Sequence, residues 1–182
     1  SNTAVGYLAL STNVSGTDNV AVGKDALLAN TANNNVAVGV DALTANTTGA
    51  NNTAIGKAAL LLNTTASYNT VVGSSAMYNN TTGSNNVAVG FQSLQQNTTA
   101  YQNTAVGTTA LKSTTTGLDN TGVGFSAMFA NTTGYNNTAV GKSSLAANTT
   151  GAQNTSVGKG ALQANTTASY NTATGHAALT AN

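Results

Sequence analysis

The 182-residue sequence contains no cysteine, no proline and no tryptophan, and only 5% of its residues are charged. Without cysteine, disulfide frameworks and thiolate metal sites are excluded. The few basic residues are all lysine and are nearly balanced by aspartate, so they cannot form the basic face that nucleic acid or an anionic membrane requires. No apolar run approaches the roughly 20 residues of a membrane span. The chain has 27 asparagines and 33 threonines. These residues must therefore interact with water at the surface, the role that charged residues have in other proteins.

A short motif recurs along the whole chain. The segment Asn2–Gly6 returns as Asn19–Gly23 and then nine more times, and the closing glycines are 17 residues apart except for one spacing of 16 between Gly23 and Gly39. The unit reads N-[TV]-A-V-G-x-x-[AS]-[LM]-x-x-N-T-T-[GA]-x-x. This self-similarity predicts a single repeat array over residues 1–182. We place the missing residue of the short unit near Asn33 and Asn34, in a surface loop.

The unit predicts one coil of a parallel β-roll or β-helix, a mainly β solenoid. Alternation and β-branched residues in N-[TV]-A-V-G favour a strand, and the glycine favours a turn. The following x-x-A-L-x-x-N is compatible with a short helical turn or with a second, irregular strand. Stacked coils would rise about 4.8 Å each, which gives a rod of roughly 50 Å. Since neither end of the array departs from the repeat, we expect the chain to be a piece of a longer one.

Two sets of residues are expected to stack along this rod. The asparagine that precedes each strand should form a side-chain amide ladder. Its members are Asn2, Asn19, Asn35, Asn52, Asn69, Asn86, Asn103, Asn120, Asn137, Asn154 and Asn171. The core is expected to combine the last apolar residue of each strand with the leucine or methionine that follows the glycine. These are Val5, Leu10, Val22, Leu27, Val38, Leu43, Ile55, Leu60, Val72, Met77, Val89, Leu94, Val106, Leu111, Val123, Met128, Val140, Leu145, Val157, Leu162 and Leu179.

So thin a core predicts association with further copies of the chain. One valine and one leucine per coil contribute roughly 1.5–3 kcal/mol each when buried, against about 17–34 kcal/mol for ordering the backbone of one coil. The alanine at the centre of each strand motif offers a small, flat face on which another copy could pack. The partner is therefore expected to be the chain itself, in lateral association or in a filament that stacks end to end.

The repeat resembles those of known fibrous proteins. The run from Asn137 through Asn148 to Gly151 looks like repeats of phage tail fibres and of large bacterial surface proteins. Its N-x-A-V-G core is similar to the head repeats of trimeric autotransporter adhesins, which form trimeric left-handed parallel β-rolls. The resemblance implies a homotrimeric fibre that is extracellular, on a cell surface or on a virion. The period of 17 and the Ala-Leu pair depart from the adhesin pattern.

The sequence does not predict catalysis, and we expect no enzyme, cofactor or metal. His176 occupies a variable position after a repeat glycine, and Asp25 with Asp41 is too small a ligand set for calcium. Candidate surface residues for a host glycan or receptor are the loop tyrosines Tyr68, Tyr101, Tyr135 and Tyr170. We therefore expect a structural extracellular fibre segment, a tail-fibre shaft or an adhesin stalk or head. The alternative is a self-assembling filament subunit, and a less favoured one is an ice-binding solenoid. Neither nucleic-acid binding nor membrane insertion is expected.

Overall fold

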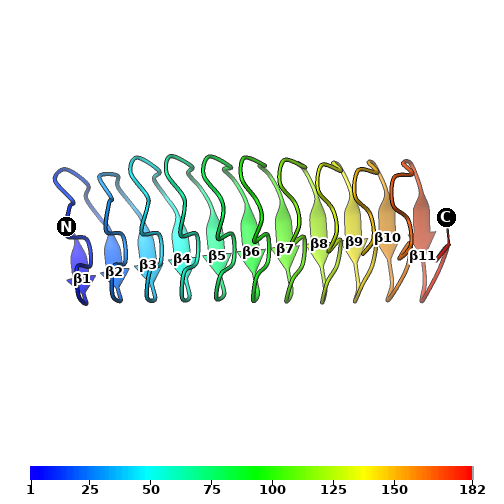
Figure 1. Ribbon diagram of the computed structural model, residues 1–182, viewed down its shortest axis with the longest axis horizontal. Coiled ribbons are helices and arrows are strands. Elements are labelled where there is room, and N and C mark those ends of the chain that lie inside the picture. Colours follow the sequence, from blue (N-terminus) through cyan, green and yellow to red (C-terminus); the bar gives the residue numbers. More distant parts are fainter. Residues whose placement is uncertain (182) are drawn as a thin grey trace.

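A computed structural model describes residues 1–181 as one rod of stacked coils. Each coil contributes one short strand, and the strands lie side by side in chain order as a single parallel sheet of eleven strands (Figure 1). The predicted parallel solenoid with one coil per repeat is confirmed. The described part of the chain has no helix that is long and apolar enough to cross a membrane.

The strands are three residues long and recur with the repeat. They are β1 (Thr3–Val5), β2 (Val20–Val22), β3 (Val36–Val38), β4 (Thr53–Ile55), β5 (Thr70–Val72), β6 (Val87–Val89), β7 (Thr104–Val106), β8 (Thr121–Val123), β9 (Thr138–Val140), β10 (Thr155–Val157) and β11 (Thr172–Thr174). Each strand residue pairs with its counterpart in the next coil, as Thr53 does with Thr70 and Ile55 with Val72. Identical positions therefore stack along the rod.

The strand ends where the repeat glycine turns the chain. At Gly90, φ is +132°, and a β-carbon there would lie 2.5 Å from the carbonyl oxygen of Gly107 in the next coil. Only glycine combines this backbone conformation with so close an approach. The recurrence of glycine at this position of every repeat thus has a steric cause.

The segment after the glycine is neither a helix nor a strand. In the coil of Gly56, both Ala58 and Leu60 adopt left-handed backbone conformations, with φ of 53°. Successive amides of this segment bond to different partners, and the Ala58 amide donates to the Val40 carbonyl of the preceding coil. The Ala59 amide donates to the Gly56 carbonyl within the coil, whereas the Leu60 amide donates to the Ala76 carbonyl of the next coil. The segment is therefore a chain of turns that also bonds to the neighbouring coils, and it is neither the helical turn nor the second strand that the sequence allowed.

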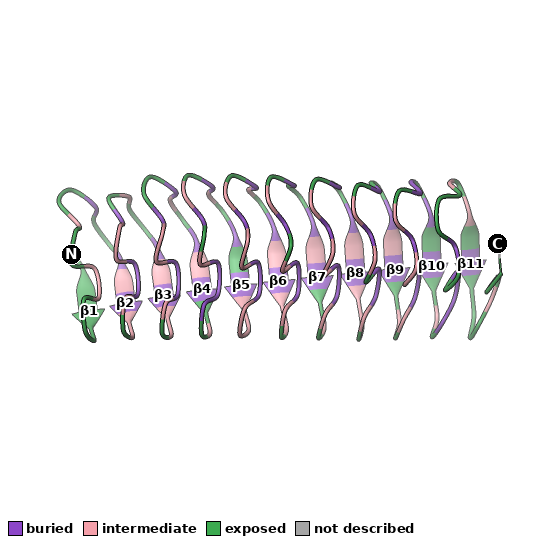
Figure 2. Cartoon of the chain, viewed as in Figure 1, coloured by how far each residue is buried: buried purple, intermediate pink, exposed green. Residues whose placement is uncertain are grey.

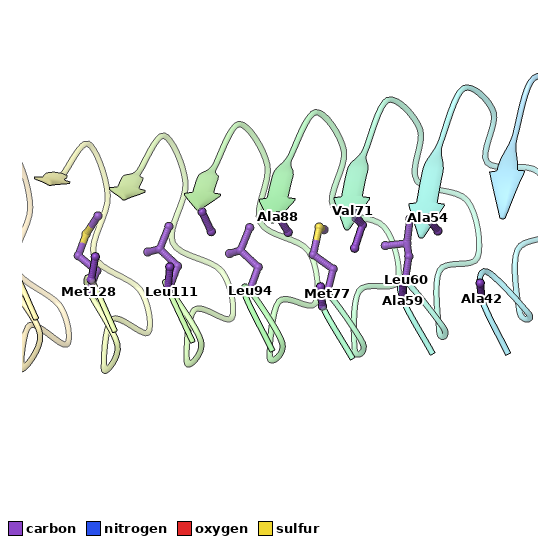
Figure 3. Packing of buried hydrophobic residues seen from close by; sticks show 14 of the residues in the cluster. Ala42, Ala54, Ala59, Leu60, Val71, Met77, Ala88, Leu94, Leu111 and Met128 are labelled. Carbon is purple, nitrogen blue, oxygen red and sulfur yellow. The ribbon is translucent and has the colours of Figure 1, made fainter. Parts of the chain in front are cut away.

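The core lies between the strands and this chain of turns. The central residue of each strand points inward and meets the leucine or methionine from the opposite side of the coil, as Ala54 meets Leu60 in Figure 3. Leu60, Met77, Leu94, Leu111 and Met128 are fully buried. At the two ends of the array, Leu10 is only partly buried and Leu179 is 47% exposed.

The prediction that the strand valines form the core is wrong. Only the middle residue of strands β2–β11 is buried, as the purple bands in Figure 2 show, and its neighbours face outward. The outward set is Val5, Val22, Val38, Ile55, Val72, Val89, Val106, Val123, Val140 and Val157, and five of these are 36–58% exposed. The leucine or methionine fills most of the interior of the coil, so the strand contributes a small residue there, usually alanine, with Val71, Gly122 and Ser156 as the exceptions. Alanine is therefore inside, and it cannot be the docking face predicted for another copy.

The structure also locates the residue missing from the short coil. In most coils the turn asparagine donates to the carbonyl oxygen three residues on, as Asn46 does to Gly49. In the short coil Asn30 donates to Ala32, only two residues on. The missing residue therefore belongs to the Thr-Thr pair, where Thr31 stands alone, and not to the stretch near Asn33 and Asn34.

Candidate functional site

Two buried ladders of asparagine run the length of the rod. In the first, which precedes the strands, the Asn52 side-chain oxygen accepts the Asn69 backbone amide at 3.0 Å and its Nδ2 at 3.3 Å. Asn69 Nδ2 also donates to the Gly83 carbonyl at 3.0 Å. The bond from the backbone amide of one asparagine to the side-chain oxygen of the asparagine before it recurs along the whole column, through Asn2, Asn19, Asn35, Asn52, Asn69, Asn86, Asn103, Asn120, Asn137, Asn154 and Asn171. These side chains tie each coil to the next and satisfy buried backbone groups, so their role is structural.

The second ladder is formed by the asparagine before the Thr-Thr pair, and it is interrupted once. Asn63 Nδ2 donates to Asn46 Oδ1 at 2.8 Å, and the pattern continues to Asn97. The next position holds Thr114, and the ladder resumes only at Asn131. Consequently Asn97 Oδ1 and Thr114 Oγ1 are buried without a hydrogen-bond partner. This break is a local weak point of the rod.

The outward face of the sheet is uniform in chemistry along the whole array. We call it the Thr/Val face, and it consists of the first and last residue of every strand, from Thr3 and Val5 to Thr172 and Thr174. All its members are Thr, Val or Ile, without a charge. Sequence reasoning missed this surface because it assigned the valines to the core. The signal was present, however, since both outward columns are strictly β-branched.

Two threonine columns differ in how their hydroxyl groups are used. In the column that begins each Thr-Thr pair, hydroxyls bond to the next coil, as Thr47 Oγ1 does to the Thr64 carbonyl at 3.0 Å. The threonines of the Thr/Val face, such as Thr53 and Thr104, donate no hydrogen bond to any group of the described residues. Their hydroxyls are thus free for an external partner or for water.

The four candidate tyrosines lie in the loop before the strands, one in every second coil from Tyr68 onward. They are exposed by 62% (Tyr68), 44% (Tyr101), 45% (Tyr135) and 78% (Tyr170). Tyr68 and Tyr170 adopt left-handed backbone conformations and use their amides to bond to the preceding coil. None of the four lines the hollows described along the rod. They form a row of separate aromatic groups and do not come together as one site.

Titratable groups are sparse and mostly separate. Lys24 Nζ is exposed and lies 3.2 Å from Oδ2 of the mostly buried Asp25, and its hydrogen bond to this carboxylate raises the pKa of Lys24. Asp25 and Asp41 follow glycines of adjacent coils, yet no group of three or more potential ligands among His, Cys, Asp and Glu occurs in residues 1–181. His176 is exposed. Comparison with known protein families, curated proteins and solved structures found no match to this chain.

Proposed function

We propose that the chain is a structural segment of an extracellular fibre, a shaft or a stalk that supports attachment to a host surface. The observation that carries the proposal is the single parallel sheet in which every strand bonds only to the strands before and after it in sequence. Each added repeat lengthens such an array by about 4.8 Å and does not create an enclosed cavity. This geometry supplies a rigid rod whose length increases with the number of repeats.

The Thr/Val face is the surface on which copies of the chain would associate. Contiguous exposed apolar surface along a soluble protein marks an interaction site. The face presents the same two columns in every coil, so a partner that matches it along its whole length must carry the same repeat. A second and third copy of the chain meet this requirement, in line with the homotrimer that the resemblance to adhesin heads implies.

The mass of the soluble protein tests this proposal. Light scattering should give three times the 17.9 kDa of one chain, and electron microscopy should show short rods. Val106→Lys, on the Thr/Val face, should release monomers, because it would bury a charge in the interface. Val14→Lys is the matched control, since Val14 is 90% exposed and lies in a loop outside the face. A wild-type monomer, or dissociation by both variants alike, would contradict lateral association through this face.

Ice binding is a second candidate because of the free threonine hydroxyls on the Thr/Val face. A flat array of hydroxyl and methyl groups at regular spacing could order water, provided that no other chain covers it. Fibre assembly therefore requires that another copy covers the Thr/Val face, whereas ice binding requires that the face is open to water. Thermal hysteresis by a monomer would favour ice binding, whereas a trimer without hysteresis favours the fibre.

A further inference from the structure

Charge is distributed unevenly along the rod. Three of the four aspartates lie within the first 41 residues, and residues 120–182 contain neither aspartate nor glutamate. Two lysines and the only histidine of the chain fall in that acid-free part. They occupy the residue directly after the repeat glycine in three consecutive coils, as Lys142, Lys159 and His176. We call these three residues the basic stripe.

The basic stripe places the two lysine charges in adjacent coils, with His176 in the coil that follows. The Lys142 carbonyl accepts the amide of Gly160, and the Lys159 carbonyl accepts that of Ala177, so the three coils are direct neighbours. Like charges that stack on adjacent strands destabilise a sheet. The ion pairs of the described residues involve Ser1, Asp18, Lys24 and Asp25, and none involves the stripe. In a protein with so few charges, this arrangement points to an anion that neutralises it from outside.

A hollow lies between the side chains of the stripe. It has a volume of about 210 Å³ and is lined by all three basic residues together with Ser143 and Gln163. Gly160 also lines the hollow, at a position where the other coils carry a side chain, for example Gln92 or Ser143. Gly160 adopts φ of +66°, which is close to the 54° of Gln92 and of Ser143, so the backbone does not require glycine here. The absent side chain opens the hollow.

An aromatic side chain continues the stripe in the preceding coil. Phe125 also follows a repeat glycine and is 53% exposed, and Lys142 Nζ lies 5.6 Å from its ring centroid. An exposed ring beside a cationic hollow offers an apolar surface next to an anion site. Sugar rings that carry a sulfate or carboxylate group combine these two properties in one ligand.

We propose that Lys142, Lys159 and His176 bind an acidic glycan, with one sulfate or carboxylate group seated in the hollow above Gly160. Lysine ammonium groups donate charge-assisted hydrogen bonds to such oxyanions. A hollow this small holds one acidic group and part of its ring. The part of the exposed Phe125 ring that Lys142 does not cover contacts the adjacent sugar. The site goes beyond the fibre function, and none of its residues belongs to the Thr/Val face.

Fluorescence anisotropy with a labelled, sulfated uronate hexasaccharide at low salt tests the site. Lys142→Gln and Lys159→Gln should each weaken binding by about tenfold, the effect of losing one hydrogen bond between charged groups. Gly160→Gln should weaken binding without changing the charge, because its side chain fills the hollow in a conformation that Gln92 already adopts. Lys57→Gln is the matched control, since Lys57 follows a repeat glycine but lies between Val40 and Ser74.

Three results would overturn the proposal. If Lys57→Gln weakened binding as much as Lys159→Gln, net charge and not the stripe would be responsible. If Gly160→Gln bound like the wild type, the hollow would have no role. If single-stranded DNA of equal charge bound as tightly as the hexasaccharide, the ligand would not be a glycan. Melting curves check that every variant is folded, and the mass of the same samples reports on the fibre proposal separately.

Discussion

At the scale of single residues, the rod depends on asparagine because its side chain both donates and accepts hydrogen bonds. Asn69 donates its backbone amide and its Nδ2 to Asn52 Oδ1, and its Nδ2 also donates to the Gly83 carbonyl, all in the interior. A serine or an aspartate could not reproduce this set, because neither combines an amide donor with an amide acceptor. The sequence alone predicted this ladder, because asparagine recurs at the same position of every repeat.

Thr114→Asn should stabilise the protein. The new side chain would donate to Asn97 Oδ1, which now has no partner, and accept from Asn131 Nδ2, so that the second ladder becomes continuous. We expect a gain of about 1–2 kcal/mol, seen as a higher melting temperature. Thr133→Asn is the control, because Thr133 is exposed and should leave the melting temperature unchanged. A loss of stability in Thr114→Asn would show that the gap in the ladder is not a defect.

Gly90→Ala should strongly destabilise the rod. Its β-carbon would lie 2.5 Å from the Gly107 carbonyl oxygen, in a backbone conformation that alanine rarely adopts. Strain and clash together should cost about 2–6 kcal/mol. Gly160→Ala provides the comparison, because its nearest contact is the mobile end of Gln163 at 3.1 Å and Ala58 occupies the equivalent position elsewhere. Chemical denaturation of both variants would measure the difference, and equal stability would refute the steric role of the repeat glycine.

At the scale of the coil, sequence predicted the strand and its alternation but not which face is inside. Hydrophobicity favours Val38 over Ala37 for the interior, yet Ala37 is buried and Val38 only partly so. The deciding quantity is the width of the coil, which depends on how the chain of turns positions Leu43 opposite the strand. That segment uses left-handed conformations at Asp41 and Leu43, and although aspartate is enriched in this conformation, leucine gives no local signal for it.

The narrow core accepts serine where its hydroxyl finds a partner, as Ser93 does at the Gly90 carbonyl. Ser144 and Ser156 stand where other coils have two alanines, such as Ala127 and Ala139. Their hydroxyl oxygens are 2.7 Å apart, and Ser156 Oγ also donates to the Ala161 carbonyl at 2.8 Å. The two substitutions therefore compensate for each other inside the core.

A double-mutant cycle should reveal this coupling. Ser144→Ala and Ser156→Ala should each cost about 0.5–1.5 kcal/mol, because each removes one side of a buried hydrogen bond. The double variant restores the alanine pair of the other coils and should lie within about 0.5 kcal/mol of the wild type. Chemical denaturation gives the three free energies of unfolding. Additive losses in the double variant would mean that the two hydroxyls do not act as a pair.

At the scale of the whole molecule, the fold is a sum of nearest-neighbour contacts. No strand of the described sheet pairs with anything but the strands before and after it. The architecture could therefore be predicted from the period alone, whereas the basic stripe could not. Its residues are variable positions in a repeat, and only the stacking of coils shows that Lys142, Lys159 and His176 line one hollow.

Deleting one whole coil should leave the rod folded but shorter. Removal of residues 103–119 joins Gln102 to Asn120, which keeps the ladder asparagine in register, and small-angle scattering should show a rod about 4.8 Å shorter. The melting temperature should change little, because the lost contacts include the unsatisfied position at Thr114.

Deleting Ala105 alone removes one residue instead of a coil, yet it should unfold the array locally, since the neighbours of Ala105 would exchange faces. Deleting Thr65 alone should be tolerated, because the short coil already lacks one residue of its Thr-Thr pair. If the single deletions at Ala105 and Thr65 were equally harmful, register in the strand would not be what holds the coils together.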